Sequence, residues 1–454
     1  MRGPLAELSE SLPGRVSTSS EDLAEYSHDN GPVLQPVLPS AVVRARSVDD
    51  VQALLRWATL HGIAVVSRGA GSGVSGGAHA TPGSVILSLE EMNRIISIDA
   101  DDETAVVEPG VVNGHLNDAV AGFGLMYAPD PASYRWSTIG GNVATNAGGL
   151  RCAKYGVTRD SVLALDVVLA DGTLISTGHR TFKGVAGYDL TALMIGSEGT
   201  LGVIVGITAR LRYLPKDERT LAAFFDTFPA AAAGVLAIGN ARVQPAILEL
   251  LDGRTLEALD DAHGSDLRRR GGSLLLVRTD GYGAAAEADV IRGALAELGA
   301  TITEEGSDEA DRLVDLRRHS RGDDTDDLYR VGEDVAVPKS QLVHYVAALE
   351  AMAAEHEVHL KVVAHAGDGN LHPTFWVERS EGPTAQERLE AALDASVRCA
   401  LDLGGTITGE HGVGQYKLRW LPWEQSDEIR ALQARIKDVF DPRGILNPGK
   451  AIVS

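Results

Sequence analysis

PDPASYRWSTIGGNVATNAGG, residues 129–149, combines six glycines or prolines with short polar side chains. Glycine costs about 1 kcal/mol per helical position and leaves a strand with nothing to pack, so this stretch cannot be one core helix or strand throughout. A backbone without bulky side chains can instead bring its N–H groups close to a ligand. Because the stretch is too long for a single turn, we expect it to wrap an extended, polar cofactor.

Length and composition indicate a multidomain globular protein. A chain of 454 residues exceeds the usual size of one domain, and 44% hydrophobic residues are enough for real cores. No apolar run approaches the roughly 20 residues that a membrane-spanning helix needs. Residues 1–30 lack the apolar centre and cleavage site of a secretory signal. We therefore expect a cytoplasmic protein without a transmembrane segment.

The charge balance restricts the partners. The formal net charge is −22, and such a field repels nucleic acid and acidic membranes, which argues against both. A small anionic substrate would need a local basic pocket. The two cysteines, Cys152 and Cys399, exclude a disulfide framework and fit free thiols in a reducing compartment.

A second glycine-rich stretch, RGAGSGVSGGA at residues 68–78, follows a short apolar strand predicted at 63–67. Its Gly71-x-Gly73-x-x-Gly76 spacing matches the dinucleotide fingerprint of Rossmann folds. However, His79 and Pro82 stand where the helix of that motif should begin, and the expected acidic residue about 20 positions on has no clear counterpart. A phosphate-binding loop that opens no helix fits better. A flexible surface loop is disfavoured because residues 69–83 carry no charged side chain.

Hydrophobic periodicity divides the chain near LPKDER, residues 214–219, where a proline and charges follow a strand. Before this boundary the pattern predicts a helix beginning at Ser47 and ending at Gly62, a second helix at 111–122, and a hairpin with strands at 161–169 and 173–177. After it, we expect an α+β domain with an antiparallel sheet. Its predicted helices span 230–240, 284–298, 340–355 and 386–403, its strands 274–278, 335–337, 360–365 and 371–376, and a last helix 426–440.

The second half contains a constellation of metal-ligand residue types. In HAGDGNLH, His365 and His372 flank a glycine-rich turn, so both rings can face one point if the flanking segments are paired strands. Later, Glu410 and His411 stand between glycines. Two imidazoles and a carboxylate suit a divalent cation such as Zn²⁺, Mn²⁺ or Fe²⁺. The alternative, that these are ordinary polar loop residues, stays open on spacing alone.

Four motifs carry a family resemblance: RGAGSGVSGG, STIGGNVATNAGG, HAGDGNLHP and TGEHGVGQYK, with IGSEGTLG and GILNPGK in support. From about Pro36 to Lys450 the chain resembles the FAD-linked oxidases and dehydrogenases of the vanillyl-alcohol oxidase and p-cresol methylhydroxylase (PCMH) superfamily. Within it, the chain is similar to the branch of D-lactate dehydrogenases, D-2-hydroxyglutarate dehydrogenase and the D subunit of glycolate oxidase. The resemblance implies an α+β, two-domain flavoprotein. The expected parts are an N-terminal helical segment (1–33), an FAD-binding PCMH-type domain (34–215), a cap or substrate domain with an antiparallel sheet (220–440), and a tail returning to FAD (441–454).

The resemblance also implies which residues hold FAD. The first loop would bind the pyrophosphate, the stretch from Pro129 would line the flavin, and the third glycine cluster and the tail would close around the cofactor. The expected cofactor-binding residues are Arg68, Gly69, Ala70, Gly71, Ser72, Gly73, Pro129, Asp130, Pro131, Ser137, Thr138, Gly140, Gly141, Asn142, Thr145, Gly148, Glu198, Gly199, Gly202, Ile204 and Asn447. Because the first loop reads Gly69-Ala70-Gly71 without the histidine of covalent members, we expect non-covalent FAD.

By the same resemblance, the metal ligands fall on His365, His372 and Glu410, with Zn²⁺ or Mn²⁺ expected, and the catalytic base falls on His411. The arginine that clamps the substrate carboxylate falls on Arg317. Two departures stand out: a tryptophan of the family is replaced by Val314, and a lysine of the 2-hydroxyglutarate enzymes by Gly332. They put a second, distal carboxylate on the substrate in doubt, although Arg318, Arg321 and Arg330 could substitute.

The implied reaction is oxidation of a small D-2-hydroxy acid to the 2-oxo acid, with the hydride passing to the flavin. The electron acceptor could be oxygen, a quinone, a cytochrome or an electron-transfer flavoprotein. A homodimer is one open possibility for the assembly. Three alternatives remain at this point: a flavin-binding subunit of a larger oxidase, a non-redox use of the fold as in alkylglycerone-phosphate synthase, and an NAD-dependent Rossmann enzyme.

Overall fold

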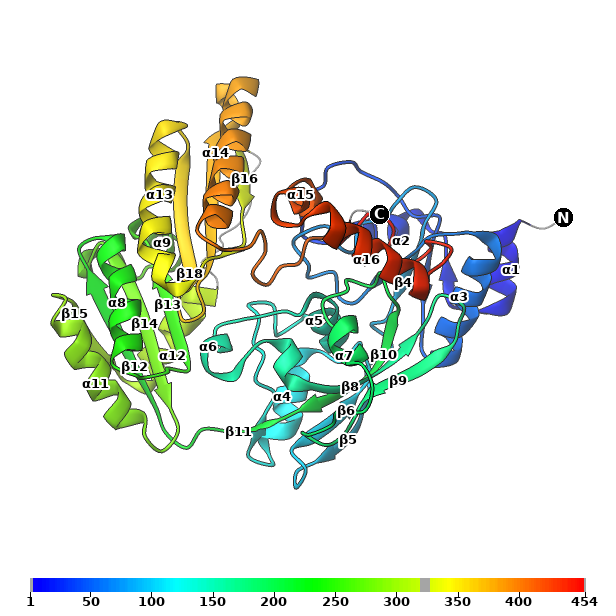
Figure 1. The fold of residues 1–454 in the computed structure, drawn as a ribbon, viewed down its shortest axis with the longest axis horizontal. Helices are drawn as coiled ribbons and strands as arrows, with labels where there is room; N and C mark the ends of the chain where they lie inside the picture. Colours follow the sequence, from blue (N-terminus) through cyan, green and yellow to red (C-terminus); the bar gives the residue numbers. More distant parts are fainter. Residues whose placement is uncertain (1–2, 319–326, 453–454) are drawn as a thin grey trace. The chain divides into compact units, whose positions relative to one another are not determined.

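The computed structural model describes residues 3–318 and 327–452, which form two compact units (Figure 1). The first unit comprises the described residues of 1–148, 156–214 and 410–454. The second comprises those of 149–155 and 215–409. No helix among the described residues is long and apolar enough to cross a membrane.

The first unit begins with a four-stranded sheet in the order β1-β2-β4-β3. Strands β2, β4 and β3 run parallel, so a crossover helix must link β2 to β3. That helix is α3, which begins where Ser47 accepts a hydrogen bond from the Asp50 backbone N–H and ends at Gly62 in the left-handed region (φ 65°), as predicted. The elements are β1 (Val16–Ser17), β2 (Ala41–Arg44), β3 (Val65–Arg68), β4 (Val85–Ser88), α1 (Pro4–Ser11), α2 (Ser20–Glu25) and α3 (Val48–His61).

The same unit contains a five-stranded antiparallel sheet in the order β5-β6-β10-β8-β9. Strands β8 and β9 form the hairpin that the sequence predicts. A two-stranded pair, β7 with β11, and several short helices complete the unit. The elements are β5 (Ile95–Asp99), β6 (Thr104–Val107), β7 (Leu125–Met126), β8 (Val162–Val168), β9 (Leu174–Gly178), β10 (Val203–Arg210), β11 (Arg212–Tyr213), α4 (Asn113–Ala121), α5 (Ile139–Thr145), α7 (Leu190–Met194), α15 (Leu421–Glu424) and α16 (Asp427–Phe440).

The segment between β3 and β4 contains no helix, although it carries the Gly71-x-Gly73-x-x-Gly76 spacing. A Rossmann dinucleotide site requires a helix that opens directly after such a loop. The segment is instead a series of turns and bends with Gly71 and Gly76 at φ 74° and 77°. The prediction of a glycine loop without a helix is confirmed, and a Rossmann-type dinucleotide site at this loop is excluded.

The second unit is built on one eight-stranded sheet with the main order β15-β12-β14-β13-β18-β19-β16, where β17 also pairs with β19. All of its strand pairs are antiparallel, as predicted. Its elements are β12 (Glu218–Phe225), β13 (Ile247–Leu251), β14 (Ser273–Asp280), β15 (Thr301–Glu305), β16 (Leu328–Gly332), β17 (Val335–Ala336), β18 (His359–His365), β19 (Asn370–Glu378), α6 (Cys152–Tyr155), α8 (Phe228–Asn240), α9 (Gly253–His263), α10 (Leu267–Arg270), α11 (Ala284–Ala296), α12 (Ser307–Arg318), α13 (Leu342–Glu355) and α14 (Pro383–Asp402).

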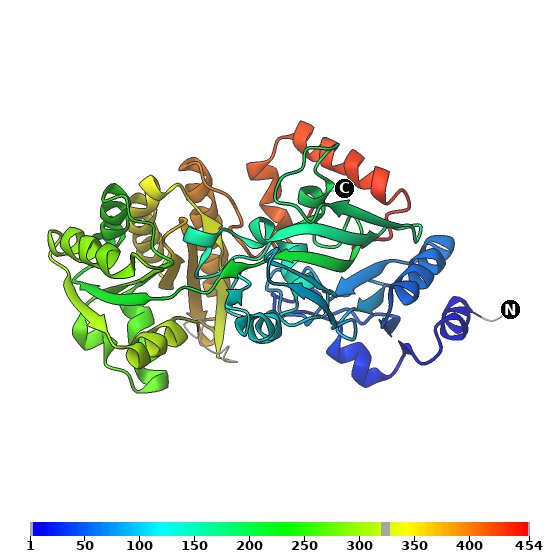
Figure 2. The ribbon, with the colours of Figure 1, turned by 90° about the horizontal axis from the view of Figure 1, so that it is seen from below.

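Helices cover both faces of this sheet (Figures 1 and 2). On one face, α8 approaches closely because Gly234 has no side chain; a Cβ there would lie 3.0–3.2 Å from Leu295, Leu275 and Phe225. On the other face, α9 and α12 pack into a core of leucines that includes Leu256 and Leu313. This second face matters for function, because the same side of the sheet carries the candidate site.

Several elements were not predicted. Residues 214–219 are predicted from the sequence to be a domain boundary, yet Glu218 and Arg219 already belong to β12, which lies between β14 and β15. Tertiary pairing overrides local charge here, because an internal strand gains hydrogen bonds from two neighbours. Strand β13 is a buried five-residue run that is apolar except for Glu249, and periodicity alone cannot assign such a run.

Candidate functional site

The glycine-rich stretches of the first unit meet because they lack side chains. A Cβ on Gly69 would lie 2.3 Å from Thr138 Oγ1, which joins the first loop to the Pro129–Gly149 stretch. A Cβ on Gly199 would lie 2.5 Å from Ser67 Oγ, which joins the third glycine cluster to the end of β3. Three segments separated by up to 130 residues therefore share one region of the first unit.

The C-terminal tail reaches the same region through Asn447. Its side-chain amide donates to the carbonyl oxygens of Gly77 at 3.0 Å and Glu198 at 2.6 Å. Lys450 donates to Asn447 Oδ1 at 2.9 Å and to the carbonyl of His79, and both Asn447 and Lys450 are buried. The tail thus ties the first loop to the third glycine cluster.

The polar residues of the Pro129–Gly149 stretch hold its own shape. Thr138 Oγ1 accepts from the Gly141 N–H at the start of α5, and Asn142 donates to Ser137 Oγ at 3.2 Å. The buried Asn113 of α4 donates to Asn142 Oδ1 at 3.1 Å and to the Pro129 carbonyl at 3.0 Å. These bonds fix the shape of the stretch from Pro129 to the first turn of α5.

Arg68 and Ser75 of the first loop have buried polar atoms that could bind a polar ligand. Arg68 donates to the His28 carbonyl at 2.7 Å and lies over the Tyr26 ring, and burial lowers its pKa. Among the described residues, neither Arg68 Nε nor Ser75 Oγ has a hydrogen-bond partner, although both atoms are buried. Buried polar atoms are normally satisfied, so these two indicate a missing partner.

Other expected cofactor residues have different surroundings. Ile204 lies on β10 and packs into the core of the five-stranded sheet. A Cβ on Gly202 would lie 2.4 Å from Val167, so close packing requires glycine there. The carboxylate of Glu198 accepts hydrogen bonds from the backbone N–H groups of Val413 and Gly414, both at 2.8 Å.

In the second unit, the two histidines of HAGDGNLH are brought together by strand pairing. β18 and β19 are antiparallel, with Val363 opposite His372 and His365 opposite Asn370. His365 and His372 therefore lie on one face of the sheet, and their ring centroids are 5.1 Å apart in an edge-to-face arrangement. The predicted condition, paired strands around a glycine turn, is met.

Glu249 of β13 joins this pair to Arg317. It lies opposite His365 on the neighbouring strand and is fully buried. Its Oε1 is 2.8 Å from His365 Nδ1, and its Oε2 is 2.6 Å from Arg317 Nε on α12. One carboxylate thus orients an expected metal ligand and the expected substrate arginine.

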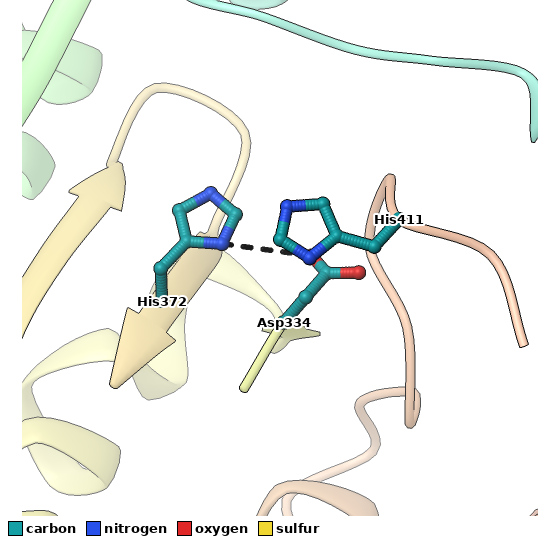
Figure 3. Close-up of side chains that lie close together, drawn as sticks. All are labelled: Asp334, His372 and His411. Carbon is teal, nitrogen blue, oxygen red and sulfur yellow. Dashed lines mark ion pairs between the residues drawn. The ribbon is translucent and has the colours of Figure 1, made fainter. Parts of the chain in front are cut away.

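Asp334 lies between β16 and β17 and is a second acidic neighbour of His372. Its Oδ1 is 3.9 Å from His372 Nδ1, and Figure 3 shows the pair with its dashed line. Its Oδ2 accepts from Thr408 Oγ1 at 2.8 Å and from the Gly409 N–H at 3.0 Å. Asp334 is fully buried. Through these two hydrogen bonds it holds the chain immediately before Glu410 and His411.

Glu410 and His411 begin the last segment of the first unit, directly after Gly409. Within that segment, His411 Nε2 is 3.8 Å from Glu410 Oε1. Among the arginines considered for a distal carboxylate, Arg318 ends α12 and Arg330 lies on β16, whereas Arg321 lies outside the described residues.

Glu249 and a role for Asp334 were not predicted from the sequence. The signal for Glu249 is an acid inside the apolar run AILELL, where a buried charge needs a partner. For Asp334 the acidic pair Glu333-Asp334 beside a short apolar strand is a weaker signal. Neither sequence pattern names the partners, because those come from strands and helices distant in the chain.

The fold and this site define the class. Residues 39–178 match the family described as FAD binding domain, and residues 214–451 match FAD linked oxidases, C-terminal domain. The chain belongs to the FAD-linked oxidases. The superfamily resemblance and the two-domain α+β fold class are confirmed. The structure also aligns with that of p-cresol methylhydroxylase over 99% of this chain and 97% of the other, with a TM-score of 0.80 at 18% identity.

Similar proteins of known name indicate which kind of FAD-linked oxidoreductase this chain is. The chain is 40% identical to glycolate oxidase subunit GlcD of Bacillus subtilis, covering 96% of this chain and 94% of the relative. It is 36% identical to D-lactate dehydrogenase of Archaeoglobus fulgidus, covering 94% and 95%. It is 32% identical to D-2-hydroxyglutarate dehydrogenase of Stutzerimonas stutzeri, covering 96% of each. The protein is therefore an FAD-dependent oxidoreductase of the type these relatives represent.

Proposed function

We propose that this protein oxidises a small D-2-hydroxy acid, of the D-lactate or glycolate kind, to the corresponding 2-oxo acid. The observation that carries the proposal is the Glu249 bridge, which sets an arginine beside a pair of histidines on one face of a buried sheet. An arginine suits a carboxylate, and imidazoles suit a metal or a proton, so the set matches a substrate with adjacent carboxylate and hydroxyl groups. The named relatives act on, or are named for, 2-hydroxy acids, which supports the same substrate class.

FAD fits the first unit. Arg68 with the N–H groups from Gly69 to Gly73 would hold its pyrophosphate, and the glycines of the Pro129–Gly149 stretch would allow close approach of the flavin. The absence of a histidine from Gly69-Ala70-Gly71 supports non-covalent binding. When bound, FAD would supply the two-electron acceptor of the oxidation.

A divalent metal, Zn²⁺ or Mn²⁺, fits His365 and His372 with Glu410. If His365 Nδ1–H donates to Glu249, Nε2 is left as the ligating nitrogen, an arrangement common for metal-binding histidines. Glu410 directly follows Gly409, whose N–H donates to Asp334, so the third ligand is adjacent in the chain to an anchored residue. Such an ion would act as a Lewis acid toward the substrate hydroxyl.

Arg317 and His411 take the two remaining roles. The guanidinium of Arg317, oriented by Glu249 through Nε, would bind the substrate carboxylate in a charge-assisted pair. His411 would accept the hydroxyl proton, since an ordinary imidazole has a pKa near ~6.5 and can act as a base at neutral pH. The substitution at Gly332 supports a substrate without a second carboxylate.

Stopped-flow reduction of the purified flavoprotein tests the proposal. A panel of D- and L-2-hydroxy acids, including D-lactate, glycolate and D-2-hydroxyglutarate, should bleach the flavin band with the small D-acids fastest. If the flavin stays oxidised with every acid while dithionite reduces it, the protein is a flavin-binding subunit without its own substrate site. If D-2-hydroxyglutarate is fastest, another group supplies the contact that Gly332 lacks.

A further inference from the structure

The segment that carries Glu410 and His411 is held by a carboxylate at each end. Upstream, Asp334 accepts from Thr408 and Gly409 within the second unit. Downstream, Glu198 accepts from Val413 and Gly414 within the first unit. Glu410, His411 and Gly412 are the only residues between the two anchored pairs, so both expected functional side chains project from a three-residue span.

The downstream contact is close and specific. Glu198 Oε1 accepts from the Val413 N–H and Oε2 from the Gly414 N–H, each at 2.8 Å. Gly412 has φ 80°, and a Cβ on it would lie 2.9 Å from Glu198 Oε1. The following N–H groups of Gln415 and Tyr416 both donate to the Ser75 carbonyl at 2.9 and 3.0 Å. Residues 412–416, which directly follow His411, are therefore held against Glu198 and Ser75 of the first unit.

The backbone of Glu198 is itself immobilised. It has a left-handed φ of 51°, its N–H donates to the Ala144 carbonyl at 2.8 Å, and its carbonyl accepts from Asn447 at 2.6 Å. Its side chain is buried, at 8% exposure for the residue. A carboxylate fixed in this way can accept from two backbone N–H groups at once, one at each oxygen.

We propose that Glu198 is a positioning residue for Glu410 and His411 and that its carboxylate does not bind the cofactor. The geometry points to this role because both carboxylate oxygens are directed at the backbone that follows His411. This inference rests on the proposed function, since it takes Glu410 as a metal ligand and His411 as the base. It differs from the sequence-based expectation, in which Glu198 is one of the cofactor-binding residues.

The first test is hydrogen exchange of the FAD-loaded protein in Glu198→Gln and Glu198→Asp. The glutamine keeps the shape but loses one acceptor, and the aspartate keeps the charge but is one methylene too short. Exchange at the Val413 and Gly414 amides should rise at least tenfold in both variants, with other regions unchanged. Unchanged protection of these two amides would overturn the proposal, whatever substrate the enzyme uses.

The second test separates the two roles by affinity. In Glu198→Gln, FAD affinity by fluorescence titration should change less than threefold, whereas Zn²⁺ or Mn²⁺ affinity should fall at least tenfold. With the substrate found in the flavin-reduction panel, kcat should fall at least tenfold with little change in KM. A loss of FAD affinity with metal affinity intact would overturn the proposal and show that Glu198 is a cofactor-binding residue.

A matched control is Asp260→Asn in the second unit. Asp260 also accepts from two backbone N–H groups, those of Leu267 and Arg268, both at 2.8 Å. It joins α9 to α10 and is not among the residues that the sequence assigns to metal or base. If Asp260→Asn lowers metal affinity as much as Glu198→Gln does, the effect is general loosening and the positioning role is wrong.

Discussion

Glu249 shows how much of the candidate site depends on single buried residues. Its carboxylate accepts from His365 and pairs with Arg317, and full burial strengthens both interactions because no water competes. Neither partner is near it in the chain. The site's orientation therefore depends on a residue that belongs to neither of the motifs it serves.

Glu249→Gln should weaken metal binding by roughly 10- to 100-fold, the range seen when a group that orients a metal-ligating histidine is changed. A neutral amide cannot accept from His365 and balance the charge of Arg317 together. Calorimetric titration with Zn²⁺ or Mn²⁺ measures the effect. Glu257→Gln, at an exposed position of α9, is the control and should bind metal normally. Equal affinity in Glu249→Gln and wild type would contradict the orienting role.

His411→Asn should retain bound flavin but reduce it at least ~100-fold more slowly, the size expected when a general base is lost. Rapid mixing with the substrate under anaerobic conditions measures the rate. His359→Asn, an exposed histidine at the start of β18, serves as the control. A near-normal rate in His411→Asn would show that another group takes the proton.

At the scale of elements, the glycine loops can pack closely against their neighbours because glycine has no side chain. Gly69 lies against Thr138, whose hydroxyl also accepts from the first turn of α5. The first glycine-rich loop, which follows β3, therefore packs against the start of α5. The local sequence shows that both stretches are loops, but their contact depends on the sheet that carries them.

Gly69→Ala should lower FAD affinity by roughly tenfold, a change of about 1.4 kcal/mol. The new Cβ would lie 2.3 Å from Thr138 Oγ1, so the threonine must move and give up its bond to Gly141. Fluorescence titration of the FAD-free protein measures the affinity. Gly239→Ala in α8 is the matched control, because nothing lies within 4 Å of its added Cβ. Unaltered FAD affinity in Gly69→Ala would place the cofactor away from this contact.

At the scale of the whole molecule, the chain passes between its two units after residues 148, 155, 214 and 409. The first unit therefore depends on a C-terminal segment that follows the second unit in sequence. That segment brings Asn447 and Lys450 into a buried polar group with Glu198. Stability of the FAD-free protein should then depend on the protonation of this group.

Burial raises the pKa of Glu198 to about 7 and lowers that of Lys450 to about 7. Glu198 binds its proton more tightly when folded, so its stabilising contribution is lost as pH rises from about 4.5 through 7. Lys450 releases its proton more readily when folded, so its contribution is lost as pH falls from about 10.5 through 7. These two groups should make the FAD-free protein least stable near pH 7.

Thermal unfolding of the FAD-free protein across this range provides the measurement. In Glu198→Gln, the free energy of unfolding should no longer fall between pH 4.5 and 7. In the wild type this fall is at most about 3 kcal/mol, at 1.4 kcal/mol per pKa unit. Lys450→Met should lose the rise between pH 7 and 10.5. If both variants follow the wild-type pH profile, the buried pair does not control it.

The sequence by itself determined the class of this protein. Its glycine patterns, with His79 and Pro82 after the first loop, disfavoured a Rossmann site, because backbone conformation and close approach depend on local residue type. The resemblance carried by the four family motifs then implied FAD. The helix from Ser47 to Gly62, the hairpin before Thr177 and the pairing around HAGDGNLH were also predictable, since caps, turns and periodicity are local signals.

Only the tertiary structure decided the partners of the buried charges. The contacts of Glu249 with Arg317, of Asp334 with Gly409 and of Glu198 with Val413 join segments between 68 and 215 residues apart. No local pattern encodes such pairings, because a buried carboxylate requires a donor but does not specify which one. The sequence predicts that the Pro129–Gly149 stretch is a cofactor loop, whereas the contacts that hold the segment of Glu410 and His411 follow from the way strands and helices pack.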